Sequence, residues 1–497
     1  MAGVPLPTDT STVWPPADLA PITADLAEAD AWWSGDPARL AQHYGRDTGA
    51  NSRRRFWAKP QPTGTKLDRI HLPIAGDIAA VGADLLFGDD LVVTVPGAHD
   101  TKADPQAVAA EQRLTELIDQ AGLATQLLEG AEVCGGLGGV YLRPAWDPAV
   151  ANHPMLDVVH ADRAVPEWRW GRLVAVTFWR ELAREGQTIW RYLERYEPGW
   201  ILHGLYAGDR DRLGVRLPLT KRPETADLED EINLGEVLGD DHLMLSRYVP
   251  NARPNRRRRG RTEGRPDTAG LEPLMDALDE TWTSWVRDIR LGKARLIVPD
   301  EFLDRSGRGQ GASFDTDREI FSPLSMDPSD VSAAGITPVQ FAIRTQEHAD
   351  TAKALVEQII TMAQYSPQTF GLDGTAAATA TEIRAREAKT LRTTNRKRRY
   401  WTPALTDVAE MLLLIDRRVF NGQAEPVRPA IAWPELAMED PHRLAETLTL
   451  LKGAQAASIE TRVRMAQPDL DQDAVAAEVG RIMAEEAIVA DPTGGFV

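Results

Sequence analysis

Few segments of this chain combine residue types at a spacing that would support chemistry. The glycine run Gly135-Gly-Leu-Gly-Gly139 is the nearest match to a nucleotide-binding loop. A dinucleotide fingerprint needs a strand before it and a helix after it, whereas this pattern predicts a helix before and a strand after. We therefore interpret the run as a helix end that turns into a strand, where glycine tolerates positive φ.

The carboxylates and histidines form no catalytic or metal-binding pattern either. The acid pairs at 89–90 and 240–241 stand at turn-like positions, which favours solvated carboxylates over a general acid–base pair. The closest histidines, His153 and His160, lack metal-ligand spacing. The Gly-Lys pair at 292–293 is followed by Ala, so it is no phosphate loop. We expect no enzymatic activity, no metal and no cofactor.

The most unusual residues form a strongly basic helix candidate within 382–429. It carries Lys389, Arg392, Arg396 and Arg399, the last three on one helical face at spacings of 4 and 3. The apolar residues that follow also step at 3 and 4, which predicts a buried face. Pro403 lies inside this pattern and predicts a kink near residues 399–403.

A loop rich in Gly, Ala and Thr precedes this helix at 366–381. Gly371 and Gly374 relax the backbone restrictions, and Thr375 is short, so the loop can approach a partner closely and move. Asp373 is the only charge between residues 370 and 381, so the loop cannot hold phosphates tightly.

Composition restricts the class of protein. A chain of 497 residues suggests roughly two to four structural units. The net charge of −18 argues against a general nucleic-acid binder. Cys134 is the lone cysteine, so no intramolecular disulfide is possible and a reducing compartment is natural. No apolar run approaches a membrane span, and the N-terminus does not resemble a signal peptide.

The remaining pattern predicts an α+β protein that is mostly helical. Residues 1–60 are expected to be helical but interrupted, with a buried helix in 70–95 that is followed by a short strand at 91–95, a helix pair over 105–133, and a helical tail over 439–491. Residues 140–248 are expected to be β-rich, with strands at 174–179, 188–196 and 200–206. Trp168, Trp170, Trp179, Trp190 and Trp200 are expected to pack in the core or at its edges. The Arg-rich segment 249–270 is expected to be a mobile loop kept extended by its own charge, either a solvated connector or a contact to a phosphate backbone.

Two long helices are expected to flank a small insert. Leu271, Leu274, Met275, Leu278 and Trp282 step at 3 and 4 in the first helix, and a second pattern runs over 345–364. If the two helices are antiparallel, they form a stalk with the insert 291–343 at its tip. The insert contains strand candidates at 294–298, 319–321 and 339–343.

From about residue 250 onward, the order of the predicted elements resembles that in the portal proteins of tailed bacteriophages, especially those of long-tailed phages. The resemblance covers about residues 70–490, and its motifs include Val249-Pro-Asn251, Tyr365-Ser-Pro-Gln-Thr-Phe-Gly371 and Thr379-Ala-Thr-Glu-Ile383. One departure is Gly270-Leu-Glu-Pro273, where many relatives have Gly-x-Ser followed by an acid.

The resemblance implies a portal fold with wing, stem, clip and crown, assembled as a ring of about twelve copies. The implied parts are a wing over residues 1–270, a first stem helix over 271–290, a clip over 291–344, a second stem helix over 345–364, a tunnel loop over 365–381, a kinked wing helix over 382–429 and a crown over 430–497.

The implied function is a channel for double-stranded DNA at one capsid vertex, for packaging, retention and ejection, and a head–tail connector. The implied partners are the terminase large subunit, the head-completion adaptor, and the major capsid and scaffolding proteins, with no membrane. Assembly would take place in the bacterial host cytoplasm and the product would lie in the virion. In the clip, Arg305 and Arg308 would contact the partners.

Two roles stay open for the basic helix face, namely guiding DNA or pairing with acids of a neighbouring copy. We favour pairing, because a channel in which DNA slides should not grip phosphates. Two other classes of protein also stay open. One is a DNA-binding or DNA-processing protein, such as a recombinase-like enzyme, and the other is a capsid protein that does not touch DNA.

Overall fold

The fold consists of two compact units, described by a computed structural model. One unit contains Met1–Asp373 and Lys389–Ala432, and the other contains Gly374–Ala388 and Trp433–Val497. The structure describes residues 6–46, 55–59, 69–100, 102–291, 295–297, 304–305, 312–313, 337–339, 344–372, 380–434, 441–467 and 472–490.

Helices of the larger unit lie near the predicted places. They are α1 (Ala20–Trp33), α2 (Pro37–Arg46), α3 (Ile74–Phe87), α4 (Pro105–Gln120) and α5 (Leu123–Leu137). Asp104 caps α4 by accepting a hydrogen bond from the Gln106 amide, with Pro105 at the first helical position. Helix α3 packs along α5, and small residues on α3 such as Ala79 and Ala83 are buried at this contact face.

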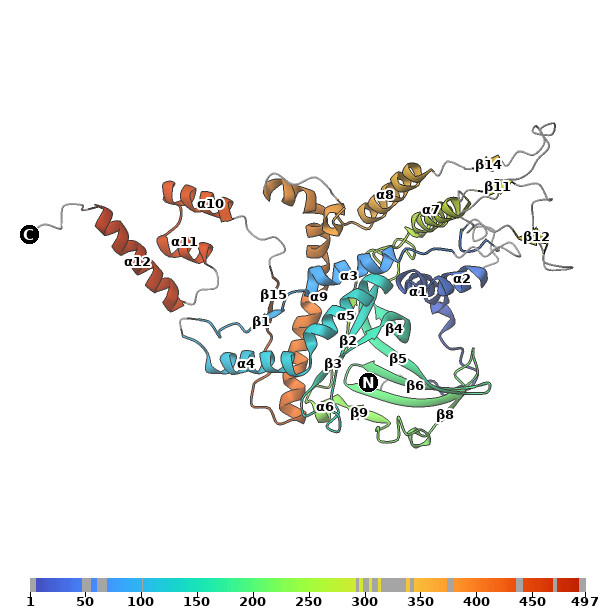
Figure 1. Ribbon diagram of the computed structural model, residues 1–497. Coiled ribbons are helices and arrows are strands. Elements are labelled where there is room, and N and C mark those ends of the chain that lie inside the picture. The colour runs from blue at the N-terminus through green and yellow to red at the C-terminus, as the bar shows by residue number, and fades with distance from the viewer. Residues whose placement is uncertain are drawn as a thin grey trace, which may run out of the picture. The chain divides into compact units, whose positions relative to one another are not determined.

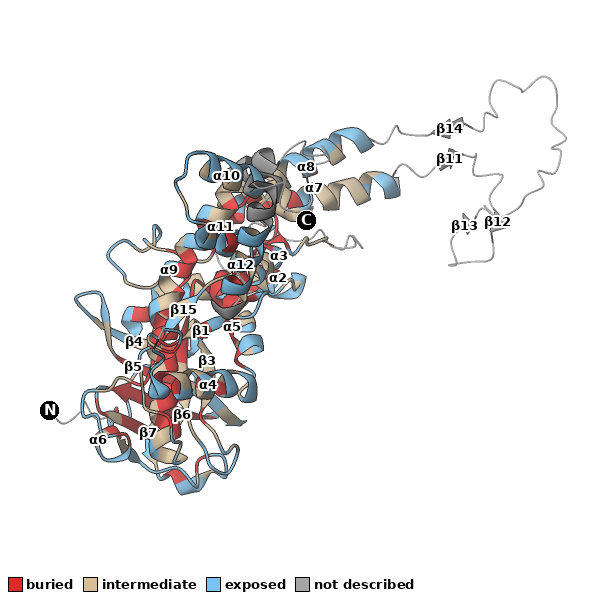
Figure 2. Ribbon diagram, turned by 90° about the vertical axis from the view of Figure 1, so that its left-hand side faces the viewer, coloured by how far each residue is buried: buried red, intermediate tan, exposed pale blue. Residues whose placement is uncertain are grey.

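Helix α9 (Ala380–Val419) is the longest element, and its residues from Lys389 onward belong to the larger unit. The predicted apolar stripe is confirmed, because Trp401, Leu405, Val408 and Leu412 are all buried. The helix runs unbroken through Pro403, and a kink at 399–403 stays a prediction. Buried residues, red in Figure 2, run through the middle of the larger unit along this helix.

The β-rich stretch predicted over 140–248 is confirmed as two antiparallel sheets. The larger has the order β4-β5-β6-β7-β8, with β9 also paired to β7. Its strands are β4 (Ala164–Arg169), β5 (Arg172–Glu185), β6 (Thr188–Glu197), β7 (Trp200–Gly208), β8 (Val215–Leu217) and β9 (Glu231–Asn233). The smaller has the order β10-β2-β3, from β10 (Arg247–Pro250), β2 (Gly139–Ala145) and β3 (Met155–His160).

A two-stranded sheet joins distant parts of the chain. Strand β1 (Val92–Thr94) pairs antiparallel with β15 (Ala430–Ala432), with Val93 opposite Ile431. In Figure 1 this sheet and α4 lie on one side of α9, and strands β4 and β5 lie on the other.

The predicted pair of long helices is confirmed as α7 (Glu272–Leu291) and α8 (Thr345–Met362), which pack side by side. Short strands between them pair as β11 (Arg295–Ile297) with β14 (Thr337–Val339), and β12 (Asp304–Arg305) with β13 (Ala312–Ser313). The other strand candidates of the insert, 319–321 and 340–343, lie outside the described residues.

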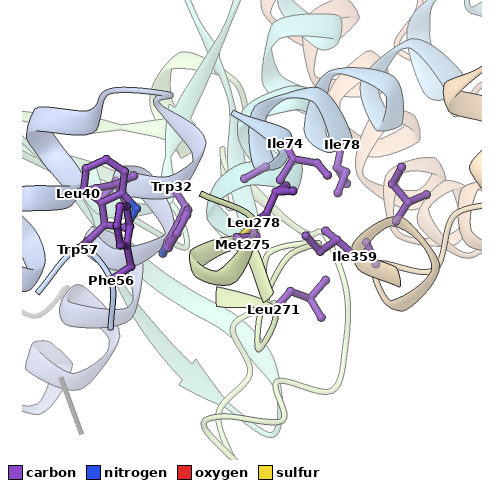
Figure 3. Packing of buried hydrophobic residues seen from close by; sticks show 14 of the residues in the cluster. Trp32, Leu40, Phe56, Trp57, Ile74, Ile78, Leu271, Met275, Leu278 and Ile359 are labelled. Atoms are coloured by element: carbon purple, nitrogen blue, oxygen red, sulfur yellow. The ribbon is translucent and has the colours of Figure 1, made fainter. Parts of the chain in front are cut away.

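The base of this helix pair is part of the hydrophobic core. Trp32, Leu40, Phe56 and Trp57 from the N-terminal segments form one cluster with Ile74 and Ile78 of α3, Met275 and Leu278 of α7, and Ile359 of α8 (Figure 3). The core therefore fixes the ends of α7 and α8 nearest the body, whereas Ile289 near the other end of α7 is exposed.

The smaller unit contains α10 (Pro441–Gly453), α11 (Ile459–Ala466) and α12 (Gln472–Ala490), as the tail pattern predicted. Ser458 caps α11 by accepting a hydrogen bond from the Thr461 amide at 3.1 Å. The helices described in either unit include none with the length and apolar character that a membrane span requires.

Candidate functional site

The basic face of α9 is present, and its members differ in their surroundings. Arg392 and Arg399 are exposed and Arg396 is half-buried. None of these three guanidinium groups forms an ion pair with another described residue. Lys389 differs, because it is half-buried and its ammonium donates a hydrogen bond to the carbonyl of Thr361 at the end of α8. Three of the four predicted residues therefore remain available to a partner.

A buried ion pair lies beneath this face. Lys397 is 3% exposed, and its Nζ lies 2.6 Å from Oδ2 of Asp267, which is 7% exposed. Tyr365 donates its hydroxyl to the same carboxylate oxygen at 3.2 Å, and Asn251 donates to Oδ1 at 2.9 Å. Burial alone would lower the pKa of Lys397, but Asp267 and Tyr365 together raise it above its ordinary value. We call these four residues the Lys397 node.

Close packing around the node depends on a glycine in α3. A Cβ atom at Gly82 would lie 2.6 Å from the hydroxyl oxygen of Tyr365 and 3.1 Å from Nζ of Lys397. Any side chain at position 82 would therefore displace the tyrosine or the lysine from its partners. The node thus joins α3, α9, the segment after α8 and the loop that precedes α7.

The segment after α8 is fastened to α9 by threonines. Thr390 accepts the Ser366 amide at 2.9 Å, and Thr393 donates its hydroxyl to the Gln364 carbonyl at 2.6 Å. This segment ends at Gly371, whose φ of 70° lies in the left-handed region. The other predicted loop residues, Asp373, Gly374 and Thr375, lie outside the described residues.

The sequence predicted that its own charge keeps the Arg-rich loop after β10 extended, and this prediction is wrong. Arg257 bridges Glu28 of α1 and Glu272 of α7, each at 2.7 Å. Arg258 pairs with Asp25 of α1 at 2.7 Å. Carboxylates from two helices therefore compensate the repulsion within the loop, and the segment is a structural clasp.

Other arginines of this loop have no such partners among the described residues. Burial lowers the pKa of Arg265, and the nearby guanidinium groups of Arg256 and Arg396 lower it further. The charges of the loop and of α9 therefore act on one another at Arg265. The sequence shows the two basic segments separately and carries no signal that links them.

Helix α7 carries a second polar site, which the sequence pattern did not predict. Asp279 is fully buried and accepts hydrogen bonds from Trp57 Nε1 at 2.9 Å and the Leu72 amide at 2.9 Å, and lies 2.8 Å from His71 Nδ1. Asp276, one turn earlier, accepts the Phe56 amide at 2.7 Å. These carboxylates clamp two N-terminal segments onto the base of α7.

Among the residues that the structure describes, no group of three or more His, Cys, Asp or Glu side chains is arranged to hold a metal ion. Of the two predicted clip contacts, Arg305 lies in strand β12, and Arg308 lies outside the described residues.

Comparison with known proteins identifies the class. Residues 57–489 match the family described as "Phage portal protein, SPP1 Gp6-like". A match over most of the chain defines a phage portal protein, which confirms the resemblance found in the sequence. Within this class, the chain belongs to the SPP1 Gp6-like family.

Two solved structures resemble this chain at low sequence identity. One chain of "Virion of native gene transfer agent (GTA) particle" is 14% identical, with 91% of this chain and 94% of that chain covered and a TM-score of 0.43. One of "Neck of empty GTA particle computed with C6 symmetry" is 13% identical, with the same coverage and a TM-score of 0.39. No curated protein matches the sequence.

Proposed function

We propose that copies of this chain form a closed ring at one capsid vertex, and that double-stranded DNA passes through the ring during packaging and ejection. The observation that carries the proposal is membership of the phage portal family over residues 57–489. The ring would also retain the packaged genome and act as the head–tail connector of the virion. No catalytic step is part of this role.

The parts of the ring follow the order of elements. Helices α7 and α8 would form the stem that lines the channel, and residues 291–344 the clip that contacts the terminase and then the head-completion adaptor. Residues 365–381 would form the tunnel loop, and residues 430–497 the crown inside the capsid, near capsid and scaffolding proteins. The half-buried Trp282 and Trp285 on α7 favour this arrangement, because neighbouring stems would cover them.

Electron microscopy of the purified protein tests the proposal directly. We expect closed rings with one subunit number, about twelve, since head-to-tail contacts that close generate cyclic symmetry. A monomer that stays monodisperse at high concentration, with no rings in the images, would contradict the proposed function.

The acidic balance of the chain fits a channel that must let DNA slide. Each cation that neutralises a phosphate releases counterions and adds affinity, so a strongly basic lining would hold the duplex in place. A chain of net charge −18 with locally basic faces can guide DNA without trapping it. The arginines of α9 would then serve mainly in contacts between subunits.

Replacing Arg396 tests the role of this face. We expect Arg396→Glu to raise the protein concentration needed for ring formation by about tenfold or more, because like charges placed across an interface cost several kcal/mol. The measurement is sedimentation velocity over a concentration series, with Arg396→Lys as the charge-conserving control. Intact rings that package DNA more slowly would instead assign Arg396 to DNA guidance.

A further inference from the structure

The turn between β4 and β5 presents a tryptophan to solvent at a conformational cost. Arg169 and Arg172 are paired, so Trp170 and Gly171 form a two-residue turn with φ values of 55° and 73°. Turns with positive φ at both positions favour Asn-Gly, and a bulky residue there is an outlier. Trp170 is nevertheless 94% exposed, which corrects the expectation that it packs in the core or at its edge.

Strain at an exposed aromatic residue suggests a role outside folding. The side chains of Arg169 and Arg172 are also exposed and form no ion pair with other described residues. The turn is therefore an apolar knob with a positive charge on each side, which has no complementary surface within its own hairpin.

A complementary groove lies elsewhere in the same unit. It has a volume of about 630 Å³ and is bounded by α4, α5, α9 and β1. Its walls are mainly apolar and include Val92, Ile118, Ala124, Leu405 and Ile431.

Carboxylates lie around this groove. Asp89, Asp90 and Asp119 are exposed members of its lining. Asp90 and Asp119 form no ion pair with any described residue. An occupant of this groove should therefore combine an apolar side chain with flanking positive charge, as the β4–β5 turn does.

The knob and the groove lie on opposite sides of α9. Leu405 lines the groove, and Arg396, nine residues earlier, points about 180° away around a helix with 3.6 residues per turn. Arg396 lies near Arg265, and the same loop carries Glu263, which accepts a hydrogen bond from Trp168 of β4 at 3.1 Å. Strands β4 and β5 therefore lie on the flank of Arg396, across α9 from β1 and α4 (Figure 1), so the turn between them is not the expected occupant of the groove in its own chain.

We propose that the β4–β5 turn of one copy inserts Trp170 into the groove between α4, α5, α9 and β1 of the next copy, while Arg169 and Arg172 pair with its carboxylates. A contact between two different surfaces is head-to-tail and repeats from copy to copy until a ring closes. The inference rests on the proposed ring and names one contact that holds it together.

Cross-linking between two cysteine variants tests the contact. Full-length Trp170→Cys and Ala124→Cys proteins are mixed, assembled and oxidised, and we expect a covalent dimer that neither variant gives alone. Native Cys134 should not interfere, since it is buried and burial raises the pKa of its thiol to about 12. Val150→Cys, at a position 71% exposed and outside the groove, is the control partner and should give no dimer with Trp170→Cys.

Assembly of Trp170→Asn gives an independent measurement. Asn-Gly suits this turn, so the variant should fold normally, yet we expect rings to need at least about tenfold more protein, as for a tryptophan that anchors an interface. Asp90→Arg with Asp119→Arg should weaken assembly similarly, and Arg169→Glu with Arg172→Glu in the same chain should restore it.

The possible outcomes distinguish a failure of the proposed contact from a failure of the proposed ring. Wild-type rings, with no cross-link between the cysteines introduced at positions 170 and 124 and with unchanged assembly of Trp170→Asn, would overturn the contact and leave the proposed function standing. Absence of rings from the wild type would overturn the proposed function itself. If another segment of the same chain covers the groove, a thiol reagent will not label Ala124→Cys in the folded monomer, which also overturns the contact.

Discussion

Lys397→Met is expected to lower the free energy of unfolding of the larger unit by about 3–5 kcal/mol, because removing one partner of a buried ion pair leaves the other charge uncompensated. Among the described residues, the Asp267 carboxylate would keep Tyr365 and Asn251 as its donors. Guanidinium denaturation, followed by tryptophan fluorescence on protein kept below the concentration at which it assembles, measures the change.

Arg392→Met is the matched control for this substitution. Arg392 lies five residues earlier on the same helix but is exposed, and arginine and methionine have similar helix propensities. The control should change stability by less than about 0.5 kcal/mol. Combining Lys397→Met with Asp267→Asn should recover part of the loss, because no charge then stays buried alone. Equal losses for Lys397→Met and Arg392→Met would show that the node contributes no stability.

Asp279→Ala is expected to cost about 3 kcal/mol or more. The substitution leaves the Trp57 indole, the Leu72 amide and the His71 ring without their buried partner, and each unsatisfied donor costs about 1–3 kcal/mol. The loss should be local to the base of α7, because these contacts hold the two N-terminal segments there.

Hydrogen exchange locates this effect. The Leu72 amide should exchange faster in Asp279→Ala, while amides in the middle of β6 should change little. Glu280→Gln is the control, since Glu280 is the next residue on α7 and its ion pair with Lys59 is half-exposed, so a change of less than about 1 kcal/mol is expected. Unchanged exchange at Leu72 in Asp279→Ala would show that the clamp does not hold this segment.

Periodicity was sufficient to find most of the elements. The 3/4 spacing of Leu271, Met275 and Leu278 predicted a helix. The three residues are buried, Met275 and Leu278 at the base of α7 and Leu271 immediately before it. Alternation over 188–196 predicted a strand, and β6 (Thr188–Glu197) occupies that place. These patterns can be recognised within a short stretch of sequence, because each element must present one apolar face that its neighbours cover.

The Lys397 node was harder to predict because its partners are far apart in sequence. Position 267 precedes position 397 by 130 residues, and no spacing rule joins them. A signal was nevertheless present, since stepping back from Trp401 by four and seven residues along the apolar stripe reaches Lys397 and Thr394, both buried. A lysine in line with an apolar stripe requires a buried acid, but the sequence alone does not say which one.

The prediction for the Arg-rich loop was wrong for a related reason. Charge repulsion within 253–265 was counted without the carboxylates of α1 and α7, which folding brings to Arg257 and Arg258. The prediction for Trp170 was wrong for a different reason. A tryptophan is expected to be buried, and only the geometry of the turn reveals that this one is exposed.

The fastening of residues 364–366 to α9 has a mechanical consequence. A pull on the chain beyond Gly371 reaches Thr369 first, whose hydroxyl oxygen lies 2.8 Å from that of Thr390 on α9. It then meets the hydrogen bonds of Ser366 to Thr390, Tyr365 to Asp267 and Gln364 to Thr393. These contacts follow one another along the chain, so tension applied beyond Gly371 reaches α8 only after they have broken in turn.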